Sequence, residues 1–201
     1  MKLYYFPGAC SLSPHIVACE AGLALQLEKV DFATGRTETG VEFSSVNPKG
    51  SVPALMLDNG EVLTEGPVIA QYLADQKPES GLAPAHGTLE RYRLLEMLGF
   101  INSELHKTYG ALFRPDTPEA TRQDARKSLL QNYAVPESRL AAADWLIGDR
   151  FTVADAYLFT VTNWAAHVAL DFSGFPALAR FQQRVARRPA VQVALKEEGL
   201  L

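Results

Sequence analysis

The 201-residue sequence has only two cysteines, Cys10 and Cys19, and no run of about 18 apolar residues. A membrane-spanning helix needs about 20 mostly apolar residues, so we expect no transmembrane segment. An excess of basic residues is also missing. The 19 Lys and Arg against 23 Asp and Glu give a net charge of −4, which argues against a nucleic-acid-binding protein. The N-terminus does not resemble a secretory signal, and we expect a cytoplasmic protein.

The low cysteine content in an acidic chain is typical of a reducing compartment. If both cysteines lie on one helix, nine positions separate them by roughly 13 Å of helical rise, beyond the Cα distance of about 7 Å that a disulfide allows. We therefore expect no disulfide between them. Cys19 lies in the small apolar segment Ile16–Gly22, and we interpret it as a buried hydrophobic residue without a catalytic role.

Cys10 is the more informative cysteine because of the segment around it. Residues 2–6 are typical of an apolar strand, Pro7-Gly8 of a turn, and a helix is expected to open at Ser11 or Ser13. Backbone N–H groups at a helix start lack intrahelical partners and favour an anion, so we expect the Cys10 thiol to ionise more readily than a free thiol. The spacing Cys10-x-x-Ser13 resembles the active-site turn of thioredoxin-like proteins, with serine replacing the second cysteine. The two serines are interpreted as helix caps.

The two halves of the sequence have different periodicities. Strand and helix patterns alternate at first: strands at 3–6 and 25–31, a helix at 13–22, a polar loop at 33–43, a hairpin at 52–57 and 61–64, and a helix at 65–75. Beyond a loop-like stretch the pattern is helical throughout, at 89–111, 118–146, 152–169, 176–187 and 190–197. We predict an α/β thioredoxin-like domain with βαβ-ββα order at 1–77, a linker at 78–87 and an all-α domain at 88–201.

Two local motifs have simple structural interpretations. Thr152-Val-Ala-Asp155 has the spacing of a helix N-cap with an acid three residues later, so Asp155 is predicted to support folding and not to act as a base. Pro53 begins a strand, where a proline cannot donate to the ladder, and it is a candidate for a cis peptide bond.

Five segments, in order along the chain, together carry a resemblance to a known family. They are Asn47-Pro-Lys-Gly-Ser-Val-Pro53, Leu63-Thr-Glu-Gly66, Glu104-Leu-His-Lys107, Phe151-Thr-Val-Ala-Asp-Ala-Tyr157 and Glu198-Gly-Leu-Leu201. With Cys10 in Pro-Gly-Ala-Cys-Ser-Leu-Ser, they resemble the bacterial beta class of cytosolic glutathione transferases over nearly the whole chain. The resemblance implies the glutathione transferase fold, a homodimer, and glutathione as co-substrate with no covalently bound cofactor and no metal.

The resemblance also implies the residues that bind glutathione. The backbone of Val52, before a cis Pro53, would pair with the cysteinyl part. Glu65 and Gly66 at a helix start would hold the ammonium and carboxylate of the γ-glutamyl end. Arg36 would replace a lysine that many members use for the glycyl carboxylate. Without the resemblance, Glu65 could merely complement its helix dipole and Pro53 could be an ordinary trans proline.

The catalytic residues implied by the resemblance are Cys10 and His106, which the family places across the cleft from each other. Trp164 is implied as a further glutathione-binding residue, with its indole N–H near the cysteine. An imidazole could accept a proton, and an imidazolium could stabilise a thiolate. His106 could instead be solvated or in the core, and Trp164 could be a core residue. His15 is interpreted as structural.

Tyr4 and Tyr5 are alternatives for the thiol site, because other classes use an N-terminal tyrosine. Neighbouring strand residues point to opposite faces, so at most one could reach it. The chain also departs from the beta class at Gly99, where an asparagine is frequent, which puts substrate choice in doubt.

The expected function is transfer of glutathione to electrophilic small molecules. A second expected activity is Cys10-dependent thiol–disulfide exchange, of thioltransferase or peroxidase type, on a small disulfide substrate. Because a thiol is a weak hydrogen-bond donor, the sequence argument favours exchange as a real activity. The alternative is a non-catalytic member of the fold that acts as a ligand carrier or regulatory scaffold.

Overall fold

The computed structural model describes residues 1–201, which form two compact units. The first contains residues 1–83 and 187–201, and the second contains residues 84–186. The C-terminal segment therefore packs with the N-terminal residues, whereas the sequence analysis assigned it to a helical domain at 88–201. None of the helices combines the length and the apolar character that crossing a membrane requires.

The first unit is built on a five-stranded mixed sheet. Its strands are β1 (Lys2–Tyr5), β2 (Gln26–Asp31), β3 (Arg36–Thr37), β4 (Ala54–Met56) and β5 (Val62–Thr64), in the order β3-β2-β1-β4-β5. β1 pairs in parallel with β2 and antiparallel with β4, and β4 pairs antiparallel with β5. The predicted βαβ-ββα order is present. The segment expected to be a loop at 33–43 differs, since it contains the short edge strand β3 and leads into α2 (Phe43–Val46).

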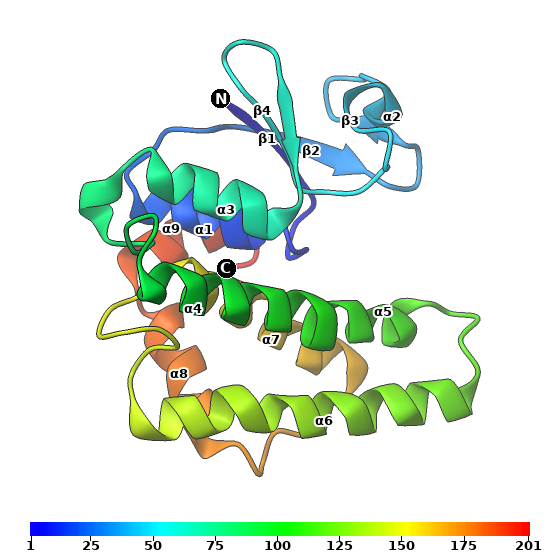
Figure 1. The fold of residues 1–201 in the computed structure, drawn as a ribbon. Coiled ribbons are helices and arrows are strands. Elements are labelled where there is room, and N and C mark those ends of the chain that lie inside the picture. Colours follow the sequence, from blue (N-terminus) through cyan, green and yellow to red (C-terminus); the bar gives the residue numbers. More distant parts are fainter. The chain divides into compact units, whose positions relative to one another are not determined.

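Three helices of this unit lie together on one side of the sheet: α1 (Leu12–Glu20), α3 (Gly66–Asp75) and α9 (Pro189–Glu197) (Figure 1). α1 packs against both α3 and α9. Polar contacts hold α9 in place, because the Arg188 guanidinium donates to both carboxylate oxygens of Glu20 at 2.6 and 2.8 Å. These contacts join residues far apart in the sequence. The periodicity of the sequence therefore could not show that residues 187–201 pack with the first unit.

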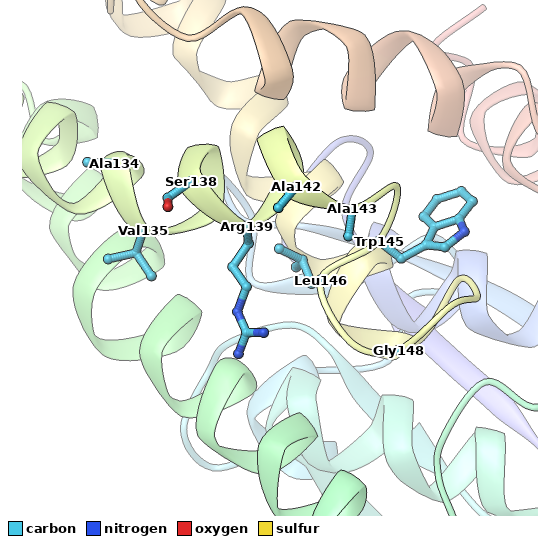
Figure 2. Close-up of a pocket in the computed structure, with 9 residues that line it drawn as sticks. All are labelled: Ala134, Val135, Ser138, Arg139, Ala142, Ala143, Trp145, Leu146 and Gly148. Atoms are coloured by element: carbon cyan, nitrogen blue, oxygen red, sulfur yellow. The ribbon is translucent and has the colours of Figure 1, made fainter.

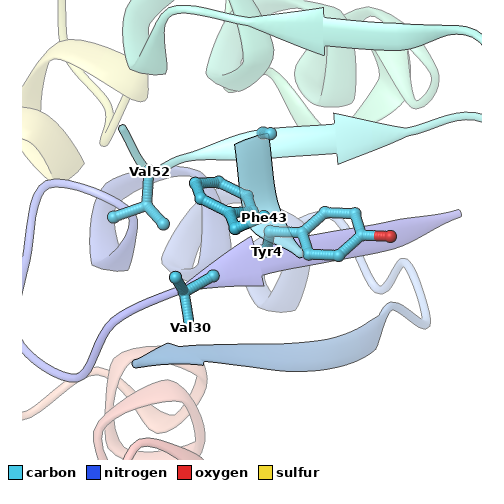
Figure 3. Close-up of a cluster of buried hydrophobic side chains, with 5 residues drawn as sticks. Tyr4, Val30, Phe43 and Val52 are labelled. Atoms are coloured by element: carbon cyan, nitrogen blue, oxygen red, sulfur yellow. The ribbon is translucent and has the colours of Figure 1, made fainter. Parts of the chain in front are cut away.

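The opposite face of the sheet carries a compact hydrophobic cluster. Tyr4, Val30, Phe43, Val52 and Ala54 are all buried and pack together, and Figure 3 shows the Phe43 ring beside the Tyr4 ring, with the two valines on the other side of Phe43. The ring centroids of Tyr4 and Phe43 are 5.8 Å apart. α2 therefore supplies one aromatic side chain that closes this face, and burial of such side chains is the main stabilising contribution.

The second unit is helical, as predicted. Its helices are α4 (Leu89–Phe100), α5 (Lys107–Phe113), α6 (Glu119–Ala142), α7 (Val153–Asn163) and α8 (Pro176–Ala186). The helix predicted for 89–111 is interrupted, because Ile101–His106 between α4 and α5 form a π-helical segment. Such segments are frequent at functional sites.

The start of α7 confirms the predicted capping role of Asp155. Its carboxylate is fully buried and accepts hydrogen bonds from the backbone N–H of Thr152 at 2.8 Å and from that of Leu146 at 2.9 Å. Burial raises the pKa of Asp155 to about 6 although these hydrogen bonds act to lower it. With every carboxylate oxygen engaged inside the protein, the residue organises the helix start.

Candidate functional site

Cys10 lies in the turn that joins β1 to α1. The turn is closed by the Ala9 N–H donating to the Phe6 carbonyl at 3.0 Å and by the Leu12 N–H donating to the Ala9 carbonyl at 3.0 Å. The hydroxyl of Ser11 contacts both the N–H and the carbonyl of Phe6 at 3.2 Å. Ser11 is therefore not the side-chain cap that we predicted, because its hydroxyl fixes the preceding loop instead.

The Cys10 thiol donates to the carbonyl of Val52 at 3.2 Å. Burial raises the pKa of this thiol to about 12. The nearby backbone N–H groups act to lower it, while the charges of Glu65 and Glu198 raise it further. The free donors at the helix start do favour the thiolate, as the sequence suggested, but loss of water around the sulfur outweighs them. In the structure Cys10 is a neutral thiol at neutral pH.

The segment that presents Val52 is a tight turn organised by Asn47. The Asn47 side chain is buried, donates to the Ser51 carbonyl at 2.7 Å and accepts from the Lys49 N–H at 3.1 Å. The Val52–Pro53 peptide bond is cis, as the resemblance implied. The turn therefore fixes the backbone of Val52 directly opposite the thiol.

Glu65 immediately precedes α3, whose first residue is Gly66. The φ of Glu65 is 71°, in the left-handed region that residues other than glycine rarely adopt. Such values concentrate at functional sites. The exposed Glu65 carboxylate accepts from the Lys49 ammonium at 2.6 Å. A Cβ at Gly66 would lie 3.6 Å from the Pro53 ring, in ordinary contact, so α3 begins next to this turn.

Arg36 lies on the edge strand β3 and is exposed. Its guanidinium donates to the Gly40 carbonyl at 2.9 Å and pairs with the Glu42 carboxylate at 3.3 Å. The structure thus brings Cys10, Val52, Pro53, Glu65 and Gly66 into one neighbourhood. It places Arg36 two strands away from β1 in the sheet order, among contacts of its own.

His106 and Trp164 belong to the second unit, where they are in mutual contact. Their ring centroids lie 4.9 Å apart in an edge-to-face arrangement. His106 is the last residue of the π-helical segment, and its Nδ1 lies 2.6 Å from the Tyr157 hydroxyl, which donates to Asn102 Oδ1 at 2.9 Å. The tyrosine hydroxyl has one proton, so Nδ1 of His106 donates to it. This tautomer leaves Nε2 as the ring nitrogen able to accept a proton.

Two residue groups at these sites were not selected from the sequence. Lys49 lies in the segment Asn47–Pro53 and Tyr157 ends the segment Phe151–Tyr157, but neither segment indicates a role for these side chains or a partner for Tyr157. The available signal for Tyr157 was its spacing of four residues after Val153 on one helix, which is too common to single out a residue. Only the fold brings Asn102 and Tyr157 together, since they are 55 residues apart.

A pocket of about 600 Å³ in the second unit is lined by α6 and the loop after it (Figure 2). Figure 2 shows Trp145 in this loop and Arg139 on α6, with Ser138 and Val135 at earlier positions of the same helix. Arg139 is the only ionisable side chain among the lining residues. The lining residues include one hydroxyl, that of Ser138, but no histidine or carboxylate that could activate it, and we assign the pocket no catalytic role.

Comparison with known proteins identifies both units. A glutathione S-transferase N-terminal domain matches residues 8–76, and a glutathione S-transferase C-terminal domain matches residues 100–189. The glutathione S-transferase GstA of Escherichia coli O157:H7 is 48% identical over 200 residues, covering 100% of both chains. The glutathione S-transferase GST-4.5 of Xanthomonas campestris is 37% identical, also over 100% of both.

Solved structures give the same result. A ternary complex of BphK, a bacterial glutathione transferase, superimposes with a TM-score of 0.98 at 51% identity over 100% of both chains. A sphingomonad glutathione S-transferase complexed with glutathione gives a TM-score of 0.96 at 49% identity, again over 100% of both. By its two matched domains, by full-length relatives and by its fold, this chain belongs to the glutathione S-transferase family.

Proposed function

We propose that the protein binds glutathione in its first unit and transfers it to electrophilic small molecules. The observation that carries this proposal is the thiol of Cys10 held 3.2 Å from the Val52 carbonyl, next to the turn that leads to Glu65. Backbone polar groups at Val52 suit an extended peptide ligand. The α3 start at Glu65 and Gly66 suits the γ-glutamyl end, which carries both an ammonium and a carboxylate.

The neutral state of Cys10 separates two chemistries. A protonated thiol can donate a hydrogen bond to the sulfur of bound glutathione, which favours its thiolate, and that sulfur then attacks an electrophilic carbon and expels the leaving group. The donor is weak, so its contribution is modest. Since the pKa of Cys10 is raised to about 12, we place this conjugation first, although the sequence argument favoured exchange.

Thiol–disulfide exchange is the second proposed activity. The Cys10 thiol loses its proton to solvent, and its sulfur attacks the glutathione sulfur of a mixed disulfide between glutathione and a small thiol. The S–S bond breaks, the small thiol leaves as a thiolate that takes a proton from solvent, and a mixed disulfide with glutathione forms on Cys10. A second glutathione thiolate attacks the glutathione sulfur of that mixed disulfide, which regenerates Cys10 and releases oxidised glutathione. Because each cycle requires the thiolate of Cys10, exchange accelerates with rising pH.

The roles of His106, Trp164 and Arg36 rest on the family resemblance. We propose that His106, through Nε2, accepts a proton or contacts substrate, that Trp164 helps to bind glutathione with its indole N–H near Cys10, and that Arg36 binds the glycyl carboxylate after leaving Glu42. We also propose that the protein is cytoplasmic and that it forms a homodimer. Light scattering of the purified chain tests the dimer. Membership of a family of named transferases supports catalysis over the alternative of a carrier or scaffold.

The test compares wild type with Cys10→Ser, using Cys19→Ser as the matched control. Each protein is incubated with oxidised glutathione at pH 8 and weighed intact, and its turnover of chlorodinitrobenzene with reduced glutathione is measured. We expect one glutathione adduct on wild type and Cys19→Ser, none on Cys10→Ser, and conjugation partly retained in Cys10→Ser. An adduct that persists in Cys10→Ser would refute the assignment of exchange to Cys10. Failure of wild type to bind immobilised glutathione or to turn over the electrophile would refute the transferase function.

A further inference from the structure

The far end of α1 carries a cluster of metal-ligating groups that the glutathione site does not use. His15 and Cys19 are four residues apart on α1, which places them on the same face of the helix. Glu197, at the end of α9, faces them. One ligand atom from each of these three side chains lies within 4.8 Å of the other two.

The geometry around His15 has the arrangement that metal-binding histidines use. Its Nδ1 lies 3.0 Å from a carboxylate oxygen of the buried Glu198, and its Nε2 lies 2.8 Å from a carboxylate oxygen of Glu197. A carboxylate that accepts from Nδ1 fixes the ring and leaves Nε2 as the ligand. Glu198 is itself held by the Gly8 N–H at 2.8 Å, so its position is determined by the fold.

The cluster also has an approach from outside. His15, Cys19 and Glu197 line a pocket of about 420 Å³ together with the exposed residues Gly22 and Ala24. A hydrated cation can therefore reach the three ligand atoms, and the half-exposed Glu197 side chain can move with little cost. Ligands of a tetrahedral zinc ion lie roughly 3.5 Å apart, given metal–ligand distances of about 2.0–2.3 Å, which is within the present spread of the three atoms.

We propose that His15 Nε2, Cys19 Sγ and the Glu197 carboxylate form a binding site for a zinc-type divalent cation, with Glu198 orienting the histidine. A thiolate and an imidazole select zinc or a similar transition metal over magnesium or calcium, which prefer oxygen ligands. Three protein ligands leave the fourth position for water. The ion would join α1 to α9 and so attach the C-terminal segment to the first unit.

Metal binding here requires proton release. In the metal-free protein the Nε2 proton of His15 lies between the ring and the Glu197 carboxylate. A cation must displace this proton and bind Cys19 as the thiolate, so metal binding releases protons to solvent. The sequence did not reveal the site, because Glu197 is 182 residues from His15.

The test is a titration of the chelator-treated full chain with zinc chloride at pH 8. Calorimetry measures the binding, and the pH change in weak buffer measures the protons released. The key comparison is Cys19→Ser against Cys10→Ser, which removes the thiol from the opposite end of α1. We expect Cys10→Ser to bind one ion per chain with proton release, and Cys19→Ser to bind at least about tenfold more weakly. Glu198→Gln should weaken binding about 10- to 100-fold, the usual effect of losing a carboxylate that supports a ligating histidine.

Cobalt provides a second readout that does not depend on stability. Cobalt(II) bound by Cys19 gives a thiolate charge-transfer absorption, which Cys10→Ser should keep and Cys19→Ser should lose. Glu197→Gln, at an exposed position, tests the third ligand without altering the core. Equal zinc affinity in Cys10→Ser and Cys19→Ser, or no saturable binding by wild type, would overturn the proposal whatever the outcome of the glutathione assays.

Discussion

The two ends of α1 place the two cysteines of the chain in opposite chemical settings. Cys10 precedes the helix and donates to a backbone carbonyl, with little water around its sulfur. Cys19 lies in the last turn, beside the ring of His15 and the carboxylate of Glu197. Burial keeps the first thiol neutral, whereas the second lies beside groups that bind protons and cations.

This difference shows that position on a helix does not by itself decide the state of a thiol. The helix start should favour the thiolate of Cys10, and the backbone N–H groups do act in that direction. Burial acts in the opposite direction and is the larger effect, so the pKa of Cys10 is raised to about 12. The desolvation of the sulfur is therefore decisive.

Glu198 connects the two ends. Its carboxylate accepts from the Gly8 N–H in the loop before Cys10 and also contacts His15 Nδ1. Its negative charge contributes to the raised pKa of Cys10. The C-terminal segment is thus part of the environment of both thiols, although it lies at the other end of the sequence.

The largest expected effect is on the alkylation rate of Cys10 as a function of pH. In Cys19→Ser, the rate with iodoacetamide should rise about tenfold per pH unit, roughly a thousandfold from pH 7 to pH 10, because only the thiolate reacts and its fraction grows up to the pKa of about 12. Stopped-time mass spectrometry measures the rate. The same measurement on Cys10→Ser gives the alkylation rate of Cys19 alone. A plateau below pH 9 for Cys10 would show that the helix start outweighs burial after all.

The next effect is on stability and comes from His15. Burial acts to lower its pKa, but contacts with Cys19, Glu198 and Glu197 outweigh it and raise the pKa from 6.5 to about 10. A histidine whose pKa is raised on folding stabilises the protein fully below the unfolded value of 6.5, and this stabilisation is lost as pH rises through about 10. The difference between 6.5 and about 10 corresponds to a contribution of at most about 5 kcal/mol.

We therefore expect the free energy of unfolding of wild type, measured with urea in the presence of chelator, to fall between pH 6.5 and pH 10. His15→Gln should be less stable at pH 6 and should show a flatter profile over this interval. His167→Gln, at an exposed position, is the matched control and should follow wild type. Parallel profiles for wild type and His15→Gln would show that the two carboxylates do not hold the imidazolium.

Glu198→Gln should affect both ends at once, by a smaller amount. The amide keeps one acceptor for Gly8 but loses the charge that faces His15, so we expect a loss of about 1–3 kcal/mol in the free energy of unfolding. Cys10 should also be alkylated faster at pH 8, because a negative charge near the thiol is removed. Glu61→Gln, on the same unit and exposed, is the control for both measurements. A change in stability with no change in the alkylation rate would show that Glu198 acts on His15 and not on Cys10.

The sequence predicts the regular elements of this fold well. Alternating and helical periodicities place the strands and helices within a few residues, and the Thr152-to-Asp155 spacing identifies the start of α7 because capping is a local interaction. The family resemblance supplies the cis Pro53. What these signals share is that each is encoded within a short stretch of chain.

The parts that could not be predicted depend on distant residues. The π-helical segment at Ile101–His106 leaves no pattern in a sequence with helical spacing throughout. The attachment of α9 to α1 depends on Arg188 meeting Glu20 across 168 positions. The pKa of Cys10 depends on burial of its sulfur in the folded protein and on the charges of Glu65 and Glu198, 55 and 188 residues away. A local argument about the helix start therefore gave the wrong direction for its pKa.

The smallest expected effect concerns Glu65, whose charge raises the pKa of Cys10 from the far side of the turn. The carboxylate is exposed and paired with Lys49, so solvent and the ammonium screen it. In Cys19→Ser without glutathione, Glu65→Gln should therefore accelerate alkylation of Cys10 only about two- to threefold at pH 8. Lys49→Met removes the screening ammonium and should slow the same reaction. If both variants change the alkylation rate of Cys10 in the same direction, the cause is a looser Val52 turn and not the charge of Glu65. Desolvation alone would then distinguish Cys10 from Cys19.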